Sequence, residues 1–533
     1  MSFTATIALA LLDWHCSTSR TPTPMKSRIQ PHGYLTLRGG SKIDRLPNEI
    51  LSTIFLLAIE QPQHCHDDLD PSLTTSPTTL SHICRRWRQV SLGTGSLWTH
   101  IVLTYPTSNE QLTRALTWLS RSKSYPLDIL LDFRDPYWDW EEETHGFSWR
   151  DMEAVLSLLL PTAPRWRTLQ LLTDTWAPIC AFLLHTRKIG PCLAKLEKLH
   201  LARCNEYFAR KGQVFKPAAL GRHLPLFGGA EAAVPRLREV ALTGVHVEWS
   251  AGHWQPLSGL TKLELRYQAA DVMPSVAQFC QILLQSPNLE VLAVVGGGPQ
   301  FLAGNEGSVG SLDGSDAREG SIRLARLTTF TFGFVDAHSA VQLLELFDLP
   351  ALRELSLEDV SASLRYQPPE DASVLLDWLA DSSHVKAASP PPIEDTNNDN
   401  DNDSSFDSST FSFSPTSSSS SPFLPLGQLH TLALHSIHTS RPSLTRLYVA
   451  CAALSSLRLS HVCDEALALL EDPPESPTTP SQSVLLPVLG TLFVRGANKE
   501  LFRRVVASPA RETTLKDTRF DESPINGYRD AES

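Results

Sequence analysis

The 533-residue sequence lacks the short motifs that mark common catalytic and cofactor-binding sites. It has no P-loop, no GxGxxG after an apolar run, no GxSxG, no HExxH and no EF-hand loop. It also has no CxxC pair among its nine cysteines, which argues against a zinc ribbon and against a secreted disulfide framework. We therefore expect no metal, no cofactor and free thiols in a reducing compartment, the cytoplasm and/or nucleus.

The sequence also lacks long apolar runs and an overall positive charge. No stretch reaches the roughly 20 apolar residues of a membrane span. The short run at residues 5–14 is interrupted by Asp13 and follows no Lys or Arg, which disfavours a signal peptide. Half of the net charge of −12 comes from residues 387–440, which hold six carboxylates and no Lys or Arg. Neither nucleic acid nor membrane is expected as a partner.

What the sequence does contain is a repeated leucine pattern. The pattern L-x-x-L-x-L, with conservative replacements, begins at Leu196, Leu237, Leu260, Leu289, Leu327, Leu352, Leu429, Leu454 and Leu489, and earlier copies begin at Trp166 and Trp98. Alternate leucines suit a short strand with one buried face. Unevenly spaced copies of this kind predict an irregular leucine-rich-repeat-like solenoid, in which each strand is followed by a helix.

Helical periodicity between the copies supports this interpretation. Three groups of apolar residues recur at i, i+3, i+4 and i+7 spacing, or part of it. They are Val276, Phe279, Cys280, Leu283 and Leu284; Ala340, Leu343, Leu344 and Phe347; and Leu501, Phe502, Val505 and Val506. The predicted fold class is α+β or α/β, a small N-terminal helical domain followed by a strand–helix array.

Composition divides the chain into four regions. Two inserts interrupt the third region, one rich in glycine and one containing PPP, NNDNDND and SSSSS. The predicted regions are a loose segment at 1–40, a helical domain at 41–105, a repeat region at 106–510 with flexible inserts at 296–320 and 383–425, and a C-terminal tail at 511–533.

The helical domain has more apolar surface than a few short helices bury. Pro47 and Glu49 suit the first turn of a helix. One face of that helix carries Ile50, Ile54, Leu57 and Ala58. A second predicted helix carries Leu80, Ile83, Cys84, Trp87 and Val90. The excess suggests a docking face for a partner, the alternative being a cap that closes one end of the solenoid.

These residues resemble an F-box domain. The matching stretches are Leu46-Pro47-x-Glu49-Ile50, Ile54-Phe55, Ile83-Cys84-Arg85-Arg86-Trp87-Arg88 and Leu97-Trp98. The chain is also similar to the F-box proteins expanded in mushroom-forming fungi, through Trp118-Leu119-Ser120-Arg121-Ser122, Pro126-Leu127 and Pro164-Arg165-Trp166-Arg167-x-Leu169. It departs from a compact F-box in the long polar segment 61–79.

The resemblance implies a substrate receptor of an SCF-type cullin–RING ubiquitin ligase. In such a receptor the F-box binds the small adaptor subunit, and through it a cullin, while the repeats hold a target protein. The implied adaptor-binding residues are Leu46, Pro47, Ile50, Ile54, Ile83 and Cys84. Trp87 and Trp98 are expected to pack internally, because large aromatic side chains dominate small cores.

Polar side chains between and after the strand leucines are the candidate target-binding residues. They are His200, Glu264, Arg266, Glu358, His435, Arg458 and Arg495. Their mixed charge favours a protein ligand over an anionic polymer.

Two other functions remain as alternatives. The first is a ligase-independent repeat scaffold that binds a partner without delivering it for ubiquitination. The second is an enzyme built on residues 132–153, in which acidic and aromatic residues are interleaved: Asp135, Asp139, Glu141, Glu142 and Glu143 among Tyr137, Trp138 and Trp140. Acids adjacent on one loop do not face each other across a scissile bond, so a non-catalytic protein is expected. The cluster His64-Cys65-His66 is not expected to bind metal, since adjacent residues rarely converge on one ion.

Overall fold

A computed structural model describes most of the chain, and it forms two compact units. The described residues are 42–59, 76–139, 144–203, 223–231, 234–249, 255–268, 272–296, 298–299, 321–361, 371–382, 424–471 and 485–522. The first unit comprises residues 1–204 and 215–237, and the second comprises 205–214 and 238–533. Outside the described residues lie the predicted loose segment 1–40, most of both predicted inserts, the cluster at 64–66 and residues 523–533.

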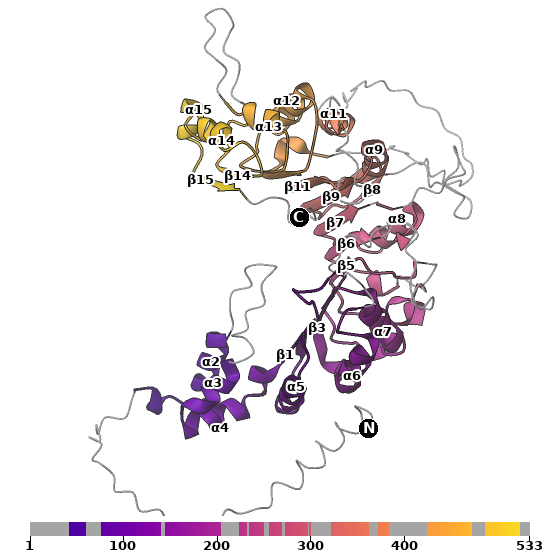
Figure 1. Ribbon diagram of the computed structural model, residues 1–533, viewed down its shortest axis with the longest axis vertical. Coiled ribbons are helices and arrows are strands. Elements are labelled where there is room, and N and C mark those ends of the chain that lie inside the picture. Colours follow the sequence, from indigo (N-terminus) through magenta and orange to yellow (C-terminus); the bar gives the residue numbers. More distant parts are fainter. Residues whose placement is uncertain are drawn as a thin grey trace, which may run out of the picture. The chain divides into compact units, whose positions relative to one another are not determined.

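The first unit joins a small helical part to a parallel sheet (Figure 1). Its elements are η2 Lys42–Arg45, α2 Asn48–Ile59, α3 Ser76–Ile83, α4 Arg85–Gly93, η4 Gly95–Trp98, β1 His100–Thr104, α5 Asn109–Arg121, β2 Leu127–Asp132, α6 Trp149–Leu159, η5 Leu160–Arg165, β3 Trp166–Thr173, α7 Trp176–Thr186, η6 Gly190–Cys192, β4 Lys198–Arg203 and η9 Leu226–Glu231. Strands β1 to β4 pair in chain order, all parallel. Helix α5 packs on β1, and α7 packs on β3 and β4.

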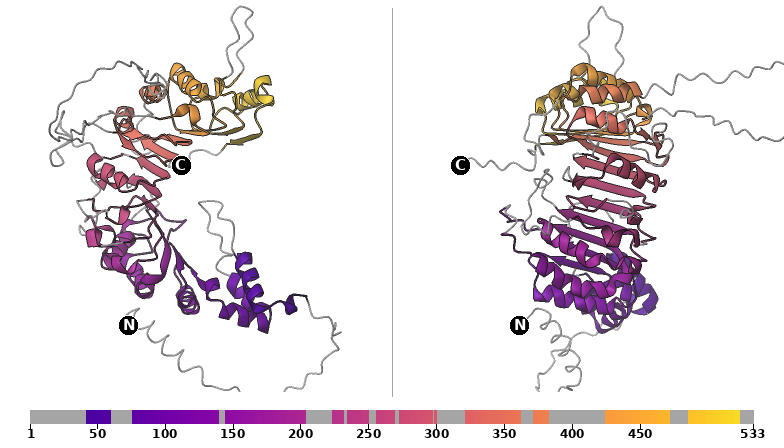
Figure 2. Two further views of the ribbon diagram at one scale, coloured as in Figure 1. Left: turned by 180° about the vertical axis from the view of Figure 1, so that it is seen from behind. Right: turned by 90° about the vertical axis from the view of Figure 1, so that its right-hand side faces the viewer.

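The second unit continues the alternation of strand and helix. Its elements are β5 Glu239–Thr243, η10 Gln255–Leu257, β6 Lys262–Gln268, α8 Val276–Leu284, β7 Val291–Gly296, β8 Ile322–Arg323, β9 Thr329–Phe334, α9 Ala337–Leu344, β10 Phe347–Asp348, β11 Glu354–Asp359, α11 Ser373–Ser382, η12 Leu426–Gln428, β12 Thr431–His435, α12 Arg441–Ala450, β13 Ser456–Ser460, α13 Asp464–Ala468, β14 Thr491–Arg495, α14 Lys499–Val506, α15 Pro509–Glu512 and β15 Asp517–Asp521. Strands β5, β6, β7, β9 and β11 to β15 pair in parallel in that order, and β8 pairs separately with β10. Helices α8, α9, α11 and α12 lie along one face of the sheet (Figure 2).

The leucine pattern predicted strands β1, β3 to β7, β9 and β11 to β14 correctly. The second leucine positions of successive copies are register partners, and every one of them is buried. In the second unit they are Val240, Leu263, Leu292, Phe330, Leu355, Leu432, Leu457 and Leu492, each at most 1% exposed. Because side chains alternate across a strand, the residues between the leucines face away from this core.

Two of the predicted helical stretches differ in detail from the structure. Helix α8 buries Ile282 and leaves Leu284 64% exposed, so the apolar face is rotated from the predicted one. Ser275 caps α8 through the backbone N–H of Gln278, which fixes where the helix begins. Helix α9 ends at Leu344, and Phe347 lies in β10, where it packs against Phe330 with a ring-centroid distance of 6.0 Å.

Four strands were not predicted: β2, β15 and the two-residue strands β8 and β10, which contain no copy of the leucine pattern. In β2 the first leucine position of the pattern is occupied by Pro126, and in β15 the second is occupied by Thr518. The predicted tail 511–533 is therefore wrong for residues 517–521, which pair with β14 as the last strand of the sheet. Edge strands often carry charged side chains, which discourage pairing with a further strand.

A residue with positive φ follows several strands. The backbone N–H of this exit residue donates to the carbonyl oxygen at the end of the next strand, as from His461 to Arg495 (2.9 Å) and from Gly496 to Asp521 (3.2 Å). The exit residues and their φ angles are Gly244 (60°), Ser436 (54°), His461 (52°) and Gly496 (67°), while Tyr267 (48°) and Gly296 (124°) have positive φ within the last two residues of β6 and β7. Glycine adopts this conformation without steric cost, whereas Tyr267, Ser436 and His461 adopt it with some strain.

Candidate functional site

Helix α2 has one buried apolar face and one exposed apolar face. Leu51 is fully buried and Phe55 is 1% exposed, and they face the rest of the helical part. Ile50, Ile54 and Leu57 are 49%, 38% and 64% exposed. Apolar side chains this accessible on a small helical unit are typical of a surface that a partner covers. The predicted shared face of α2 is therefore the exposed one.

The predicted second helix is in fact two helices. Helix α3 ends at Ile83, and Cys84 is extended, with φ −155° and ψ 170°. The Cys84 thiol accepts a hydrogen bond from the backbone N–H of Trp87 (3.4 Å), so it caps the start of α4. The break leaves Ile83 56% exposed and the Cys84 thiol exposed, whereas Val90 is buried on α4.

Arg86 ties the beginning of α2 to α4. Its Nε and Nη2 donate to Asn48 Oδ1 at 3.2 and 3.1 Å, and Nη2 also donates to the carbonyl oxygen of Leu46. The Phe55 and Trp87 rings pack 4.7 Å apart between the same two helices. Together these contacts hold Pro47 in its exposed position, beside the half-buried Leu46, at the start of α2.

Trp98 is a buried core residue where the helical part meets α5. It is fully buried, its Nε1 donates to the carbonyl oxygen of Ser91 (2.9 Å), and its ring meets Trp118 edge-on at 5.5 Å. The Arg121 guanidinium lies 4.4 Å from the ring centroid. The prediction that Trp98 packs internally is confirmed, and Trp87 is half-buried.

We use the name docking face for seven residues that lie at the start of α2, along its exposed side and at the break between α3 and α4. It comprises Leu46, Pro47, Ile50, Ile54, Leu57, Ile83 and Cys84. The six predicted adaptor-binding residues all belong to it. Leu57 is the residue that the sequence-based set omitted, although helical spacing from Ile50 and Ile54 places it on the same face.

The predicted target-binding residues all lie on strands, on the side away from the leucine core. His200 is on β4 of the first unit and is half-buried. On β6, Glu264 accepts from Arg266 Nε (2.9 Å) and pairs with Lys262 Nζ (2.7 Å). Burial raises the pKa of Glu264, but the hydrogen bonds and charges of these two cations together outweigh it and lower the pKa. Glu264 and Arg266 thus largely neutralise each other.

The remaining four of these residues lie on neighbouring strands of the second unit. Glu358 on β11 is the register partner of His435 on β12, and it accepts a hydrogen bond from the Tyr267 hydroxyl (3.3 Å). Arg458 on β13 and Arg495 on β14 follow on the next two strands. The sheet therefore brings together residues that are far apart in the sequence.

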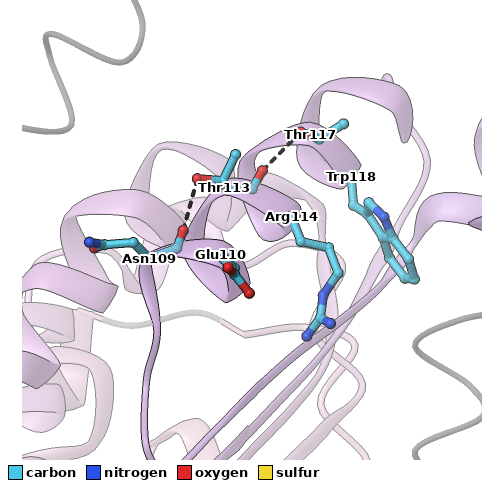
Figure 3. Close-up of a pocket in the computed structure, with 6 residues that line it drawn as sticks. All are labelled: Asn109, Glu110, Thr113, Arg114, Thr117 and Trp118. Carbon is cyan, nitrogen blue, oxygen red and sulfur yellow. Dashed lines mark hydrogen bonds between the residues drawn. The ribbon is translucent and has the colours of Figure 1, made fainter.

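A shallow groove of about 440 Å³ lies on α5 (Figure 3). Its lining residues are Asn109, Glu110, Thr113, Arg114, Thr117 and Trp118. All six come from one helix, and the Thr113 and Thr117 hydroxyls donate to carbonyl oxygens of their own helix at 2.8 Å. Because one helix surface supplies the whole lining, its polar groups do not converge on a ligand from different sides, so the groove does not resemble a small-molecule site.

In the acidic and aromatic segment at residues 132–153, two of the described acidic side chains accept local hydrogen bonds. Asp135 accepts from the Tyr137 N–H (2.9 Å), and Asp139 accepts from the Thr144 hydroxyl (2.7 Å). Residues 140–143, including three of the acids, lie outside the described residues. Within the part of the chain that the structure describes, no group of His, Cys, Asp or Glu is arranged to hold a metal ion.

Nearby, His145 is buried against Asp174, with His145 Nε2 3.1 Å from Asp174 Oδ2. Burial lowers the pKa of His145, but the hydrogen bond and charge of Asp174 help to raise it overall. Since the Phe147 N–H donates to His145 Nδ1 (3.1 Å), both ring nitrogens have partners. His145 therefore has a structural role, in which hydrogen bonds to both ring nitrogens hold the imidazole in place.

Comparison with known proteins supports the first of these sites. Residues 43–104 match the F-box-like family model, a span that runs from η2 to the end of β1 and contains the whole docking face. No curated protein matches the chain. None of the described helices is long and apolar enough to cross a membrane.

Proposed function

We propose that this protein is a non-catalytic substrate receptor of an SCF-type cullin–RING ubiquitin ligase. The F-box-like match at residues 43–104 suggests binding to the ligase adaptor. The single observation that carries the proposal further is the docking face, whose apolar side chains stay exposed on a folded helical part. A receptor of this kind acts by holding its target close to the ubiquitin-charged enzyme.

The docking face also favours a receptor over a structural cap. A cap would bury its apolar face against the adjoining repeat. Here Trp98 on η4 packs against Trp118 of the strand–helix part, while Ile50, Leu57 and Ile83 stay roughly half or more exposed. An apolar surface with this exposure suits a protein partner.

The proposal extends to the strand–helix region. It is a degenerate leucine-rich-repeat solenoid of the type present in F-box proteins of mushroom-forming fungi, and its polar strand face binds the target protein. The receptor works in the cytoplasm and/or nucleus and has no catalytic activity of its own. The buried strand leucines and the strictly sequential parallel pairing support the repeat assignment.

The proposal is tested by measuring whether the adaptor binds the chain and whether it protects the docking face from chemical modification. Cys84 and Cys192 are both exposed thiols, and only Cys84 lies in the docking face. When the chain is saturated with purified adaptor, alkylation of Cys84 by N-ethylmaleimide should slow at least about tenfold, because a packed interface excludes the reagent. Alkylation of Cys192 should continue at its original rate. Peptide mapping by mass spectrometry reads both sites in one sample.

Two outcomes would contradict the proposal. If the folded chain does not bind the adaptor, the ligase-independent scaffold becomes the better description. If the adaptor binds while Cys84 and Cys192 react as fast as before, the docking face lies elsewhere. Pre-alkylated chain offers a further check, because a bulky group on Cys84 should block adaptor binding.

A further inference from the structure

The polar face of strands β12, β13 and β14 carries a cluster of cationic side chains. Each of its strand members, His435, Arg458 and Arg495, directly follows a buried leucine or valine, so these members face away from the core. The register aligns Ala433 with Arg458 and Phe493, and it aligns His435 with Ser460 and Arg495. Adjacent strands are about 4.8 Å apart, so Arg458 lies diagonally next to both His435 and Arg495.

A second histidine joins the cluster from the exit position of β13. His461 has φ 52°, a conformation that is sterically strained for a non-glycine residue. The equivalent residue after β14 is Gly496, and a Cβ atom there would lie 2.2 Å from His461 Nδ1. The imidazole therefore occupies the space left by the missing side chain, next to Arg495. Strain of this kind at a non-glycine residue often marks a functional position.

The charges in this cluster are only partly compensated. Arg495 Nε lies 3.4 Å from Asp521 Oδ2, and Arg519 Nη2 lies 3.6 Å from Asp517 Oδ2, so these four residues pair off. Glu358, next to His435 in the register, accepts from Tyr267. Arg458 is exposed and makes no ion pair or side-chain hydrogen bond within the described residues. One guanidinium thus remains uncompensated.

The pKa values of the two histidines reflect the same excess of positive charge. Burial lowers the pKa of His435, and the charges of Arg458, His461 and Arg495 lower it further. Burial and Arg495 lower the pKa of His461, while Asp521 opposes the shift. At neutral pH both histidines are therefore mainly uncharged, and Arg458 alone supplies the free positive charge.

We propose that Arg458, His435 and His461 bind a carboxylate side chain of the target protein, with Phe493 contacting an apolar residue beside it. The planar guanidinium of Arg458 matches the two oxygens of a carboxylate. One uncompensated guanidinium balances the charge of a monoanion, whereas a doubly charged phosphoryl group would leave one negative charge uncompensated. The inference rests on the proposed function, because it takes the polar strand face to be the target-binding face.

The test is a binding measurement with three labelled peptides on the full-length chain. In the first peptide, three glutamates alternate with leucines. The second peptide has glutamine in place of each glutamate, and the third has phosphoserine in place of each glutamate. Fluorescence anisotropy should give the glutamate peptide at least about tenfold higher affinity than the glutamine peptide, as one charge-assisted pair provides. Equal affinities would overturn the proposal. A phosphoserine peptide that binds more than about tenfold tighter than the glutamate peptide would overturn the choice of a carboxylate.

Substitutions then test whether this cluster is the binding site. Arg458→Gln should remove the preference for glutamate. Arg441→Gln is the matched control, since Arg441 is also an exposed arginine of the second unit but lies at the start of α12. A preference that survives Arg458→Gln, or that is lost equally in the control, would place the carboxylate site elsewhere.

The pH dependence gives a second readout. Lowering the pH from 7.5 to 5.5 should strengthen glutamate-peptide binding about threefold or more, because the bound carboxylate raises the pKa of both histidines and proton uptake is thereby linked to binding. In the His435→Gln/His461→Gln variant, binding should become independent of pH in this range. A pH response that is unchanged in this variant would exclude the two histidines from the site.

Adaptor binding by the same samples separates the two proposals. If the chain binds adaptor but shows no preference for the glutamate peptide, the carboxylate site is wrong and the receptor function stands. If it prefers the glutamate peptide but does not bind adaptor, the receptor function is wrong while the carboxylate site remains.

Discussion

Replacing Ile50 and Leu57 with glutamate is expected to weaken adaptor binding at least about 100-fold. Both side chains are exposed apolar groups on the docking face, at 49% and 64%. In a packed interface each glutamate would be buried without a partner, at a cost of several kcal/mol. A loss of 100-fold corresponds to about 2.8 kcal/mol, so the expectation is conservative. Isothermal titration calorimetry with purified adaptor measures the change.

A matched pair of substitutions controls for the added charge. Leu284 on α8 and Val374 on α11 are 64% and 45% exposed, close to the values for Leu57 and Ile50. Leu284→Glu/Val374→Glu should leave adaptor affinity unchanged within twofold. Since all four side chains are solvent-accessible, neither variant should unfold the chain. Similar losses in both variants, or none in the first, would contradict the assignment of the docking face.

Trp98→Ala is expected to destabilise the helical part by about 3–5 kcal/mol. The indole is fully buried, contacts Trp118 and Arg121, and donates to the Ser91 carbonyl oxygen. Removing it leaves a cavity between η4 and α5. Hydrogen exchange of the α4 amides is the suitable measurement, because it reports local opening in a chain of two units that need not unfold in one step.

Two further variants separate the cavity from the hydrogen bond. Trp98→Phe keeps much of the ring and loses the donor, so we expect a smaller cost of about 1–2 kcal/mol. Trp149→Ala removes an indole that is 42% exposed and should change stability by no more than about 0.5 kcal/mol. If Trp98→Ala had as little effect as Trp149→Ala, Trp98 would not be a core residue that stabilises the helical part.

The strands were predictable because their leucines obey a simple rule. A residue that faces the core at every second position must be apolar, and the pattern beginning at Leu260, Leu289 or Leu454 follows this rule. Strands β2 and β15 were missed because the pattern is incomplete in each. Pro126 ends the connection before β2 and takes the first leucine position, and β15 is an edge strand whose residues are mostly exposed.

The candidate sites were predictable in part. The F-box motif identified the docking residues, but helical spacing could not say which apolar stripe of α2 is buried, since Leu51 and Phe55 are as apolar as Ile50 and Ile54. The separation of α3 from α4 depends on a thiol cap at Cys84, a residue with no strong capping preference in sequence statistics. The grouping of His435, Arg458 and Arg495 depends on strand register, which only the folded sheet defines.

The sequential pairing of strands makes the sheet tolerant of very different connection lengths. Only 20 residues join β12 to β13, whereas 71 join β11 to β12, yet both pairs keep a five-residue register without a shift. The entropy of closing a loop grows with the logarithm of its length, about 0.6 kcal/mol for each doubling, so the longer connection costs only about 1 kcal/mol more. Segments between the strands can therefore lengthen or shorten over evolution at little thermodynamic cost, while the strands keep the same neighbours.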